Sequence, residues 1–138
     1  MPEDMNIKNT RLIIVPEIVD PRGNLCFVEE GRGLPFAVRR TFWTYNVPTT
    51  AIRAGHAHRR NEQLHVCVSG SVTFQLDDGK NREEIVLDHP SKVLYTGPMV
   101  WHWLKNWKEG TALLVLNSIK YEEEEYVRSY QEFLEMTR

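Results

Sequence analysis

Apolar and polar residues alternate over short stretches along most of the chain. The segments LHVCVSG at 64–70 and SVTFQLDDG at 71–79 carry an apolar residue at every second position. A period of two is typical of a β-strand with one buried face. Further short segments rich in β-branched and aromatic residues begin at residues 10, 25, 36, 83, 92, 100 and 112. Strands this short, with no helical segments between them, predict a β-sandwich or barrel.

Turn residues separate these segments, and only the end of the chain has a helical period. Asp77–Gly79 predicts a tight hairpin, and Ser69–Gly70 and Gly97–Pro98 mark two further turns. In residues 122–136 the apolar side chains repeat every three or four positions, which predicts a short C-terminal helix. The acidic run Glu122–Glu125 would then favour the positive end of the helix dipole. We expect a single domain over residues 1–138.

Composition narrows the class of protein. The net charge of −2 is unlike the basic face of a nucleic-acid binder, so we expect no nucleic-acid partner. We also expect no membrane association, because no apolar run approaches the roughly 20 residues of a membrane span. The N-terminus has no apolar signal-peptide core. Cys26 and Cys67 lie in apolar segments, which favours free thiols and a cytoplasmic location.

Two histidines one residue apart carry the strongest chemical signal. In RAGHAHRRNEQ, residues 53–63, His56 and His58 point to the same face of a strand. Beyond a short loop, Gln63 and His65 share a face of the next strand, and Glu62 faces the opposite way. A third histidine, His102, follows the Gly-Pro turn, with the flanking Trp101 and Trp103 expected on the other face of its strand. The arrangement resembles the two motifs of the cupin family, which implies an all-β jelly-roll barrel (a double-stranded β-helix) with a short C-terminal helix.

Two kinds of chemistry are compatible with this histidine set. Metal-binding cupins place a carboxylate seven residues before the glycine of the turn, and counting back from Gly70 gives Gln63 instead of Glu62. A metal-dependent enzyme would use His56, His58 and His102 with Glu62 or Gln63, but a neutral amide balances a divalent cation poorly. Without a metal, imidazoles that titrate near ~6.5 suit proton transfer beside a carbonyl. A sugar-binding cupin without catalysis is a third possibility.

Longer stretches resemble one particular group of cupins. DPRGNLCFVEE, LPFAVRRTFWTYNV, the HAH segment, LDDG, GPMVWHWL and YEEEEYVRSYQEFL together are similar to the WxcM-like nucleotide-sugar 3,4-ketoisomerases. The resemblance implies conversion of dTDP-4-keto-6-deoxyglucose to a dTDP-3-keto-6-deoxyhexose through an enediol, in deoxysugar biosynthesis. It also implies a dTDP-linked keto-deoxysugar as partner and no metal or other cofactor.

The same resemblance implies roles for individual residues. The catalytic residues would be three histidines: His56, His58 and His102, with one of the first two removing the C3 proton and His102 orienting the sugar. Arg22 and Arg53 would hold the diphosphate through bidentate contacts, with Arg22 reaching across a subunit boundary. The substrate-binding set is completed by Arg59, Gln63, Trp43 and Tyr45. Many relatives have tyrosines where this chain has Phe42 and Trp43, which leaves the proton donor and the C4 stereochemistry open.

The assembly follows from the exposed strand edges of a small barrel. Such edges are usually covered or paired. The apolar segment Arg11–Val15, followed by Pro16, suits exchange with a partner subunit. We therefore expect a homodimer, the commonest symmetric state.

Overall fold

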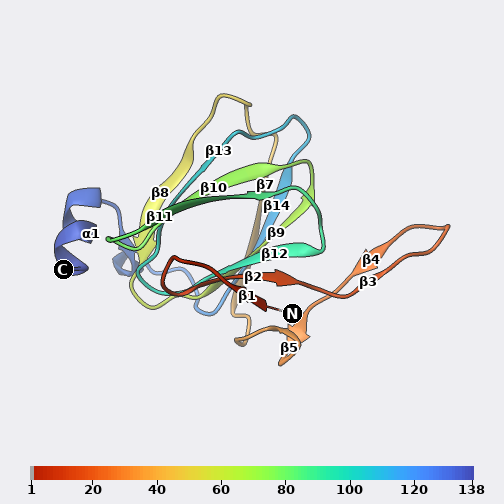
Figure 1. Ribbon diagram of the computed structural model, residues 1–138, viewed down its shortest axis with the longest axis horizontal. Coiled ribbons are helices and arrows are strands. Elements are labelled where there is room, and N and C mark those ends of the chain that lie inside the picture. Colours follow the sequence, from red (N-terminus) through yellow and green to blue (C-terminus); the bar gives the residue numbers. More distant parts are fainter. Residues whose placement is uncertain (1) are drawn as a thin grey trace.

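The computed structural model describes residues 2–138, with side chains from Met5 onward, and is built on two large antiparallel β-sheets (Figure 1). The six-stranded sheet contains, in spatial order, β1 (Pro2–Asp4), β2 (Thr10–Ile14), β12 (Lys92–Thr96), β9 (Gln63–Ser69), β14 (Ala112–Asn117) and β7 (Arg40–Tyr45). The five-stranded sheet contains β11 (Arg82–Leu87), β10 (Val72–Asp77), β13 (Trp101–Lys105), β8 (Arg53–His58) and β15 (Tyr126–Val127). The predicted all-β cupin jelly roll is confirmed.

Of the predicted turns, one lies within a sheet and two connect the two sheets. Asp77–Gly79 begins the turn of the β10–β11 hairpin, within one sheet. Ser69–Gly70 and Gly97–Pro98 instead carry the chain from the six-stranded sheet to the five-stranded one. Gly70 has a φ of +76°, and a Cβ there would lie 2.6 Å from the Cα of Thr111, so only glycine fits.

The space between the sheets holds an apolar core and, beside it, a polar cluster. The core side chains are fully buried, and the largest are Trp107, Phe74, Leu76, Leu87, Leu94 and Leu113. Their burial supplies the main favourable term in folding, on the order of 1.5–3 kcal/mol for each large side chain. Cys67 lies in this core as a free thiol and Cys26 is a half-buried free thiol, as predicted.

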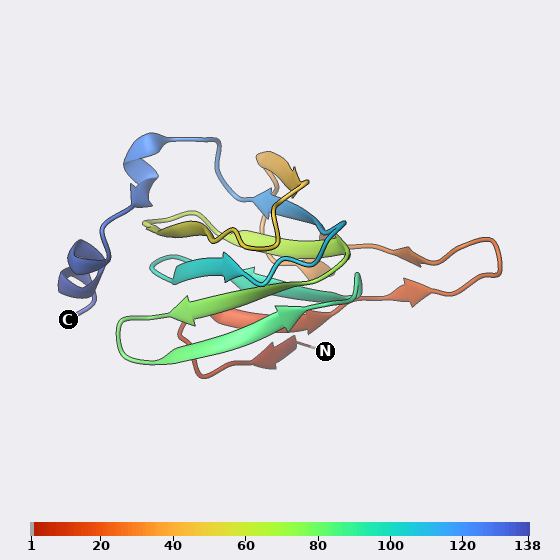
Figure 2. The same ribbon diagram turned by 90° about the horizontal axis from the view of Figure 1, so that it is seen from above.

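The segment before β7 contains two small two-stranded units. The hairpin of β3 (Glu17–Ile18) and β4 (Leu25–Cys26) extends away from the barrel (Figures 1 and 2). After it come β5 (Glu29–Glu30) and β6 (Gly33–Leu34). Leu34 at the end of β6 and the nearby Phe36 pack on the outer face of the six-stranded sheet.

The N-terminal strand is present. β2 lies between β1 and β12, and both of its edges are paired within the chain. Exchange of this segment with a partner subunit, in which the same ladders would form between two chains, stays a prediction. The outermost strands of the six-stranded sheet are β1 and β7.

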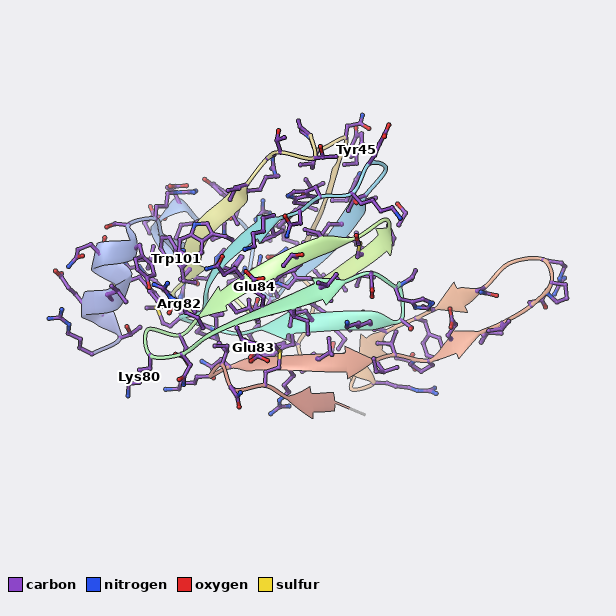
Figure 3. The ribbon with its side chains drawn as sticks, turned by 45° about the horizontal axis from the view of Figure 1, so that its top comes forward. Tyr45, Lys80, Arg82, Glu83, Glu84 and Trp101 are labelled. Carbon is purple, nitrogen blue, oxygen red and sulfur yellow. The ribbon has the colours of Figure 1, made fainter. Side chains whose placement is uncertain are left out.

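The C-terminal segment differs from the predicted helix over 122–136. It contains a 3₁₀ turn (η1, Glu123–Glu125), then β15, and only then the helix α1 (Tyr130–Met136). α1 starts at Ser129, whose side chain accepts a hydrogen bond from the backbone N–H of Glu132. Its Phe133 is buried against Trp101, which lies on the side of the barrel that faces α1 (Figure 3). No helix in residues 2–138 is long and apolar enough to cross a membrane.

The predicted role of the acidic run is also wrong, because one of its carboxylates is a buried structural acceptor. Glu125 is only 3% exposed and accepts hydrogen bonds from the backbone N–H groups of Arg60 and Asn61. The guanidinium of Arg60 also lies 3.3 Å from this carboxylate. Since these residues follow β8 directly, Glu125 fixes the loop after His58 and attaches the C-terminal segment to the barrel.

Replacing this carboxylate should destabilise the fold. Glu125→Ala would leave the backbone N–H groups of Arg60 and Asn61 without acceptors, the second of them buried, and we expect a loss of about 2–4 kcal/mol in the free energy of unfolding. Glu125→Gln keeps one acceptor oxygen and should lose less. Urea unfolding followed by circular dichroism measures both. The control Glu124→Ala, at an exposed neighbour, should change the free energy by less than about 0.5 kcal/mol; equal effects of Glu124→Ala and Glu125→Ala would contradict this role.

Candidate functional site

Three histidines from two neighbouring strands meet inside the barrel. His56 and His58 come from β8, and His102, which lies opposite His56 in the ladder, comes from β13. The ring centroid of His56 is 5.0 Å from that of His58 and 4.9 Å from that of His102. Trp101 and Trp103 lie together on the other face of β13, in the cluster that contacts α1. The predicted orientations of the three histidines and the two tryptophans are therefore confirmed.

A β-bulge sets the directions of the side chains along β8. The register shifts between His102 and Trp103, so that the four residues Arg53–His56 stand opposite three residues of β13. Ala54 and Gly55 adopt positive φ values of 67° and 78°. In a regular strand, Arg53 and His56 would point to opposite faces. The extra residue brings both of them to the same cavity.

The cavity beside the histidines has a volume of about 160 Å³. His56 and His102 line it together with Arg53, Gln63 and His65. This volume is well below the roughly 300–1,000 Å³ of a site that encloses a whole drug-sized ligand. The cavity therefore suits a group of the size of one sugar ring, with the rest of a larger ligand outside. Within the described residues the guanidinium of Arg53 forms no hydrogen bond or ion pair, which leaves it available to an anion.

The three imidazoles are uncharged. Burial, with a smaller contribution from the neighbouring imidazoles, lowers the pKa of His56 to about 2 and that of His58 to about 3. Burial also lowers the pKa of His102 to about 4. The Nδ1 atom of His102 lies 3.2 Å from the carbonyl oxygen of Val100. Because a carbonyl only accepts, this nitrogen carries the proton and Nε2 carries a lone pair.

Unpartnered polar atoms gather around the same cavity. Nδ1 of His56, both ring nitrogens of His58 and Oε1 of Gln63 are buried without hydrogen-bond partners among the described residues. Buried polar groups are rarely left unpaired in folded proteins, so a concentration of them indicates a place for a polar ligand.

Gln63 and Glu62 face opposite sides of β9, as the alternation predicts. Gln63 is buried and donates from Nε2 to Oδ1 of Asn117 at 2.9 Å. Glu62 instead accepts a hydrogen bond from the hydroxyl of Tyr95 at 2.6 Å. Among the side chains described, from Met5 onward, no group of three or more His, Cys, Asp or Glu has the geometry to hold a metal ion. The cavity thus offers a divalent cation no carboxylate, and the donor set does not fit the carboxylate-containing cupin site.

Two of the predicted substrate-binding arginines lie away from the cavity. Arg22 is 90% exposed on the β3–β4 hairpin, and Asp20 accepts two hydrogen bonds from its guanidinium, at 2.9 and 3.0 Å. Arg59 donates to the backbone carbonyl of Glu124 and lies 3.5 Å from the Glu132 carboxylate. Within this chain, both therefore make structural contacts at the surface.

The predicted aromatic contacts lie on the outer side of β7. Trp43 and Tyr45 are 64% and 63% exposed, whereas the alternate residues Phe42 and Thr44 line the cavity. Figure 3 shows Tyr45 at the periphery of the molecule. Phe42 is therefore the position at which a hydroxyl would have faced the site. The substrate-binding roles of Trp43 and Tyr45 stay predictions.

Some residues beside the site had no assigned role in the sequence analysis. The ring of Tyr126 lies 5.0 Å from that of His56 and 4.6 Å from that of His58. Arg40 donates to the Tyr126 hydroxyl at 3.4 Å, and the guanidinium of Arg128 lies over the same ring. Tyr126 was missed because the helical period over 122–136 concealed the short strand β15.

The buried neutral histidines predict a pH-dependent stability. Unfolded histidines take up protons below about pH 6.5, whereas the folded pKa values of His102, His58 and His56 are about 4, 3 and 2. The unfolded state then binds more protons, so stability should fall as the pH is lowered from 7 to 5.5. Below about pH 6 the slope approaches 1.4 kcal/mol per pH unit for each of these imidazoles.

Urea unfolding at pH 7.0, 6.0 and 5.5 measures this slope. His58→Gln should reduce it by the contribution of one imidazole. His89→Gln, at an exposed histidine outside the cavity, should leave it as in the parent protein. A free energy of unfolding that is constant over this range would contradict the neutral state of the cluster.

Comparison with known proteins agrees with this geometry. A protein of Aneurinibacillus thermoaerophilus, TDP-4-oxo-6-deoxy-alpha-D-glucose-3,4-oxoisomerase, is 37% identical over 89% of this chain and 88% of its own length. The sugar 3,4-ketoisomerase QdtA of Thermoanaerobacterium thermosaccharolyticum, solved with TDP, is 33% identical, with a TM-score of 0.91 over 94% of this chain and 95% of that one. WlaRB of Campylobacter jejuni, a TDP-quinovose 3,4-ketoisomerase, is 38% identical, with a TM-score of 0.90 over 94% and 99%. The family model described as FdtA, WxcM-like, C-terminal, matches residues 8–138, and the chain therefore belongs to the WxcM-like family.

Proposed function

We propose that this protein is a 3,4-ketoisomerase that converts TDP-4-keto-6-deoxyglucose to a TDP-3-keto-6-deoxyhexose. The observation that carries the proposal is the set of three neutral imidazoles, two of which line a sugar-sized cavity, in a chain 37% identical to an oxoisomerase of this substrate. QdtA, its structural relative, binds the same keto sugar in a mutant form.

The reaction moves hydrogen between two adjacent carbons. A base removes the proton from C3, the electrons of that C–H bond form the C3–C4 double bond, and the C4 oxygen takes up a proton to give an enediol. A proton then adds to C4, and the hydroxyl at C3 loses its proton to become the new ketone. Two protons are taken up and two are released, so the histidines regain their starting state and no oxidant is required.

The geometry supports His56 as the base. His56 lines the cavity, while His58 lies behind it, 5.0 Å away from ring to ring, and is 4% exposed. A neutral imidazole has the lone pair that a base needs. The imidazolium formed in this dry site would be costly, but it lies beside the negative charge that develops on the enediol oxygens. His58 can exchange a proton with His56, and His102 orients the sugar through its Nε2 lone pair.

The nucleotide must lie outside the small cavity. Arg53, unpartnered at the cavity, is suited to hold the diphosphate through bidentate hydrogen bonds. Arg22 would contribute from a second subunit, as expected from the sequence. Arg59, Trp43 and Tyr45 keep their proposed roles in binding the substrate, and Gln63 would contact the sugar.

We further propose that the protein is a homodimer. The β3–β4 hairpin carries exposed apolar side chains at Ile18, Val19 and Leu25 and extends away from the barrel (Figure 2). An apolar groove of about 250 Å³ that includes Val66, Val68 and Leu114 lies on the outer face of the six-stranded sheet. Packing of the hairpin against this face of a partner would cover both surfaces and bring Arg22 to the second subunit. A single domain over 1–138 and a cytoplasmic location, supported by the two free thiols, complete the proposal.

The reaction itself is tested by proton NMR of TDP-4-keto-6-deoxyglucose in heavy water without added metal. We expect the 3-keto sugar to form with deuterium from solvent at C4. His56→Asn and His58→Asn should each lower kcat by about a hundredfold or more, the usual scale for losing a general base. His89→Asn is the matched control and should keep the parent rate.

Three results would count against this function. Tight binding with no deuterium in the sugar would favour a non-catalytic sugar-binding cupin. Activity that is lost on chelation and returns only with a metal would favour the metal-dependent alternative. A kcat equal to that of the parent protein in both histidine variants would show that His56 and His58 take no part in the proton transfers.

The diphosphate contact predicts a specific kinetic change. Arg53→Ala should raise KM by about ten- to a hundredfold with a smaller effect on kcat, because the diphosphate does not change during the reaction. Arg53→Lys should recover only part of the loss, since an ammonium lacks the planar fork. Arg22→Ala should also raise KM. Lys80→Ala, at an exposed cation in the β10–β11 turn (Figure 3), is the control and should leave KM unchanged. If an arginine variant has a lower melting temperature but an unchanged KM, that arginine does not bind the substrate.

A further inference from the structure

A fourth histidine lines the cavity without a part in the proton transfers described above. His65 lies on β9, is 2% exposed and lines the cavity with His56 and His102. Its ring centroid is 5.8 Å from that of His102, and its other ring contact is with Phe74. Burial, followed by the neighbouring imidazoles, lowers the pKa of His65 well below the ordinary value, so the ring is neutral.

The hydrogen bond to Thr96 determines which ring nitrogen carries the proton. Nε2 of His65 lies 2.9 Å from the hydroxyl oxygen of Thr96, which is 2% exposed and has no other hydrogen-bond partner in the described chain. Either direction of this hydrogen bond leaves one buried proton without an acceptor in the described chain: the Thr96 hydroxyl proton if Nε2–H donates, or the Nδ1–H of His65 if Thr96 donates. Only the second leaves that proton on a ring that lines the cavity, where a bound sugar oxygen can accept it. We therefore assign Thr96 as the donor, with the proton of His65 on Nδ1.

The Nδ1–H group of His65 has no acceptor among the described residues. A buried N–H donor that lacks a partner costs stability, so its presence here indicates a role toward a ligand. On the same cavity wall, His102 has the opposite polarity, because its Nδ1–H is held by the Val100 carbonyl and its Nε2 is an acceptor. The two rings thus present one donor and one acceptor to a bound sugar.

We propose that His65 donates a hydrogen bond from Nδ1 to a sugar oxygen on one of the two reacting carbons, and that Thr96 is the positioning residue that fixes this tautomer. The proposal rests on the proposed ketoisomerase function. A neutral imidazole N–H can stabilise an enediol oxygen as its charge develops, and it does not give up its proton permanently. The contact strengthens as negative charge grows on the oxygen, so its loss should affect kcat more than KM.

Kinetics and the protonation of the ring together test this role. His65→Leu removes the donor and should lower kcat by about a hundredfold, as for the loss of one oxyanion donor. Thr96→Val, which allows the other tautomer, should lower kcat by about tenfold, and Thr96→Ser, which keeps the hydroxyl, should restore most of the parent rate. The ¹⁵N chemical shifts of the His65 ring nitrogens should report a protonated Nδ1 in the parent protein.

The outcomes separate this inference from the proposed function. A parent protein that does not convert TDP-4-keto-6-deoxyglucose would overturn the proposed function and this inference with it. An active parent with unchanged kcat in His65→Leu would overturn this inference alone. If His65→Leu does not fold, equal rates for Thr96→Val and Thr96→Ser, or a protonated Nε2 in the parent spectrum, would overturn it.

Discussion

The burial of the histidines in the barrel lumen is the constraint on which the site depends. Water would solvate an imidazolium, whereas the packed interior disfavours it, and the pKa values of all four lumen histidines fall as a result. Imidazoles without charge can lie about 5 Å apart without repulsion. They keep lone pairs and N–H groups that point to defined places, which is what a reaction made of proton transfers requires.

The structure around the histidines holds this buried arrangement in place. Glu125 ties the loop after His58 to the C-terminal segment, and Asn117 receives hydrogen bonds from both Asn61 and Gln63. These contacts connect β8, β9, β14 and the segment before α1, which are far apart in the sequence. The C-terminal segment thus contributes to the site, and its Tyr126 contacts the histidine rings directly.

Alternation, which depends only on local geometry, predicted an all-β sandwich or barrel and the shared face of His56 and His58. The jelly roll and the meeting of these two with His102 were expected from the resemblance to the cupin motifs. Alternation also placed Gln63 in the lumen and Glu62 outside. Alternation applied to β7, in place of the family pattern, would also have put Trp43 and Tyr45 on the face opposite that of Phe42 and Thr44. The C-terminal helix was predicted too long, because the buried partners of Glu125 come from residues about 65 positions earlier, beyond any local pattern.

The bulge in β8 depends on the number of residues in the strand and not on their type. Four residues from Arg53 to His56 face three on β13, and the anion-binding group and the base share a cavity only because of the extra residue. A deletion of a single position there would leave every functional side chain in the chain and yet turn one of the two away. The number of residues between Arg53 and His56 therefore matters as much as the histidines themselves. A search for relatives by motif alone would accept sequences that have lost the extra residue.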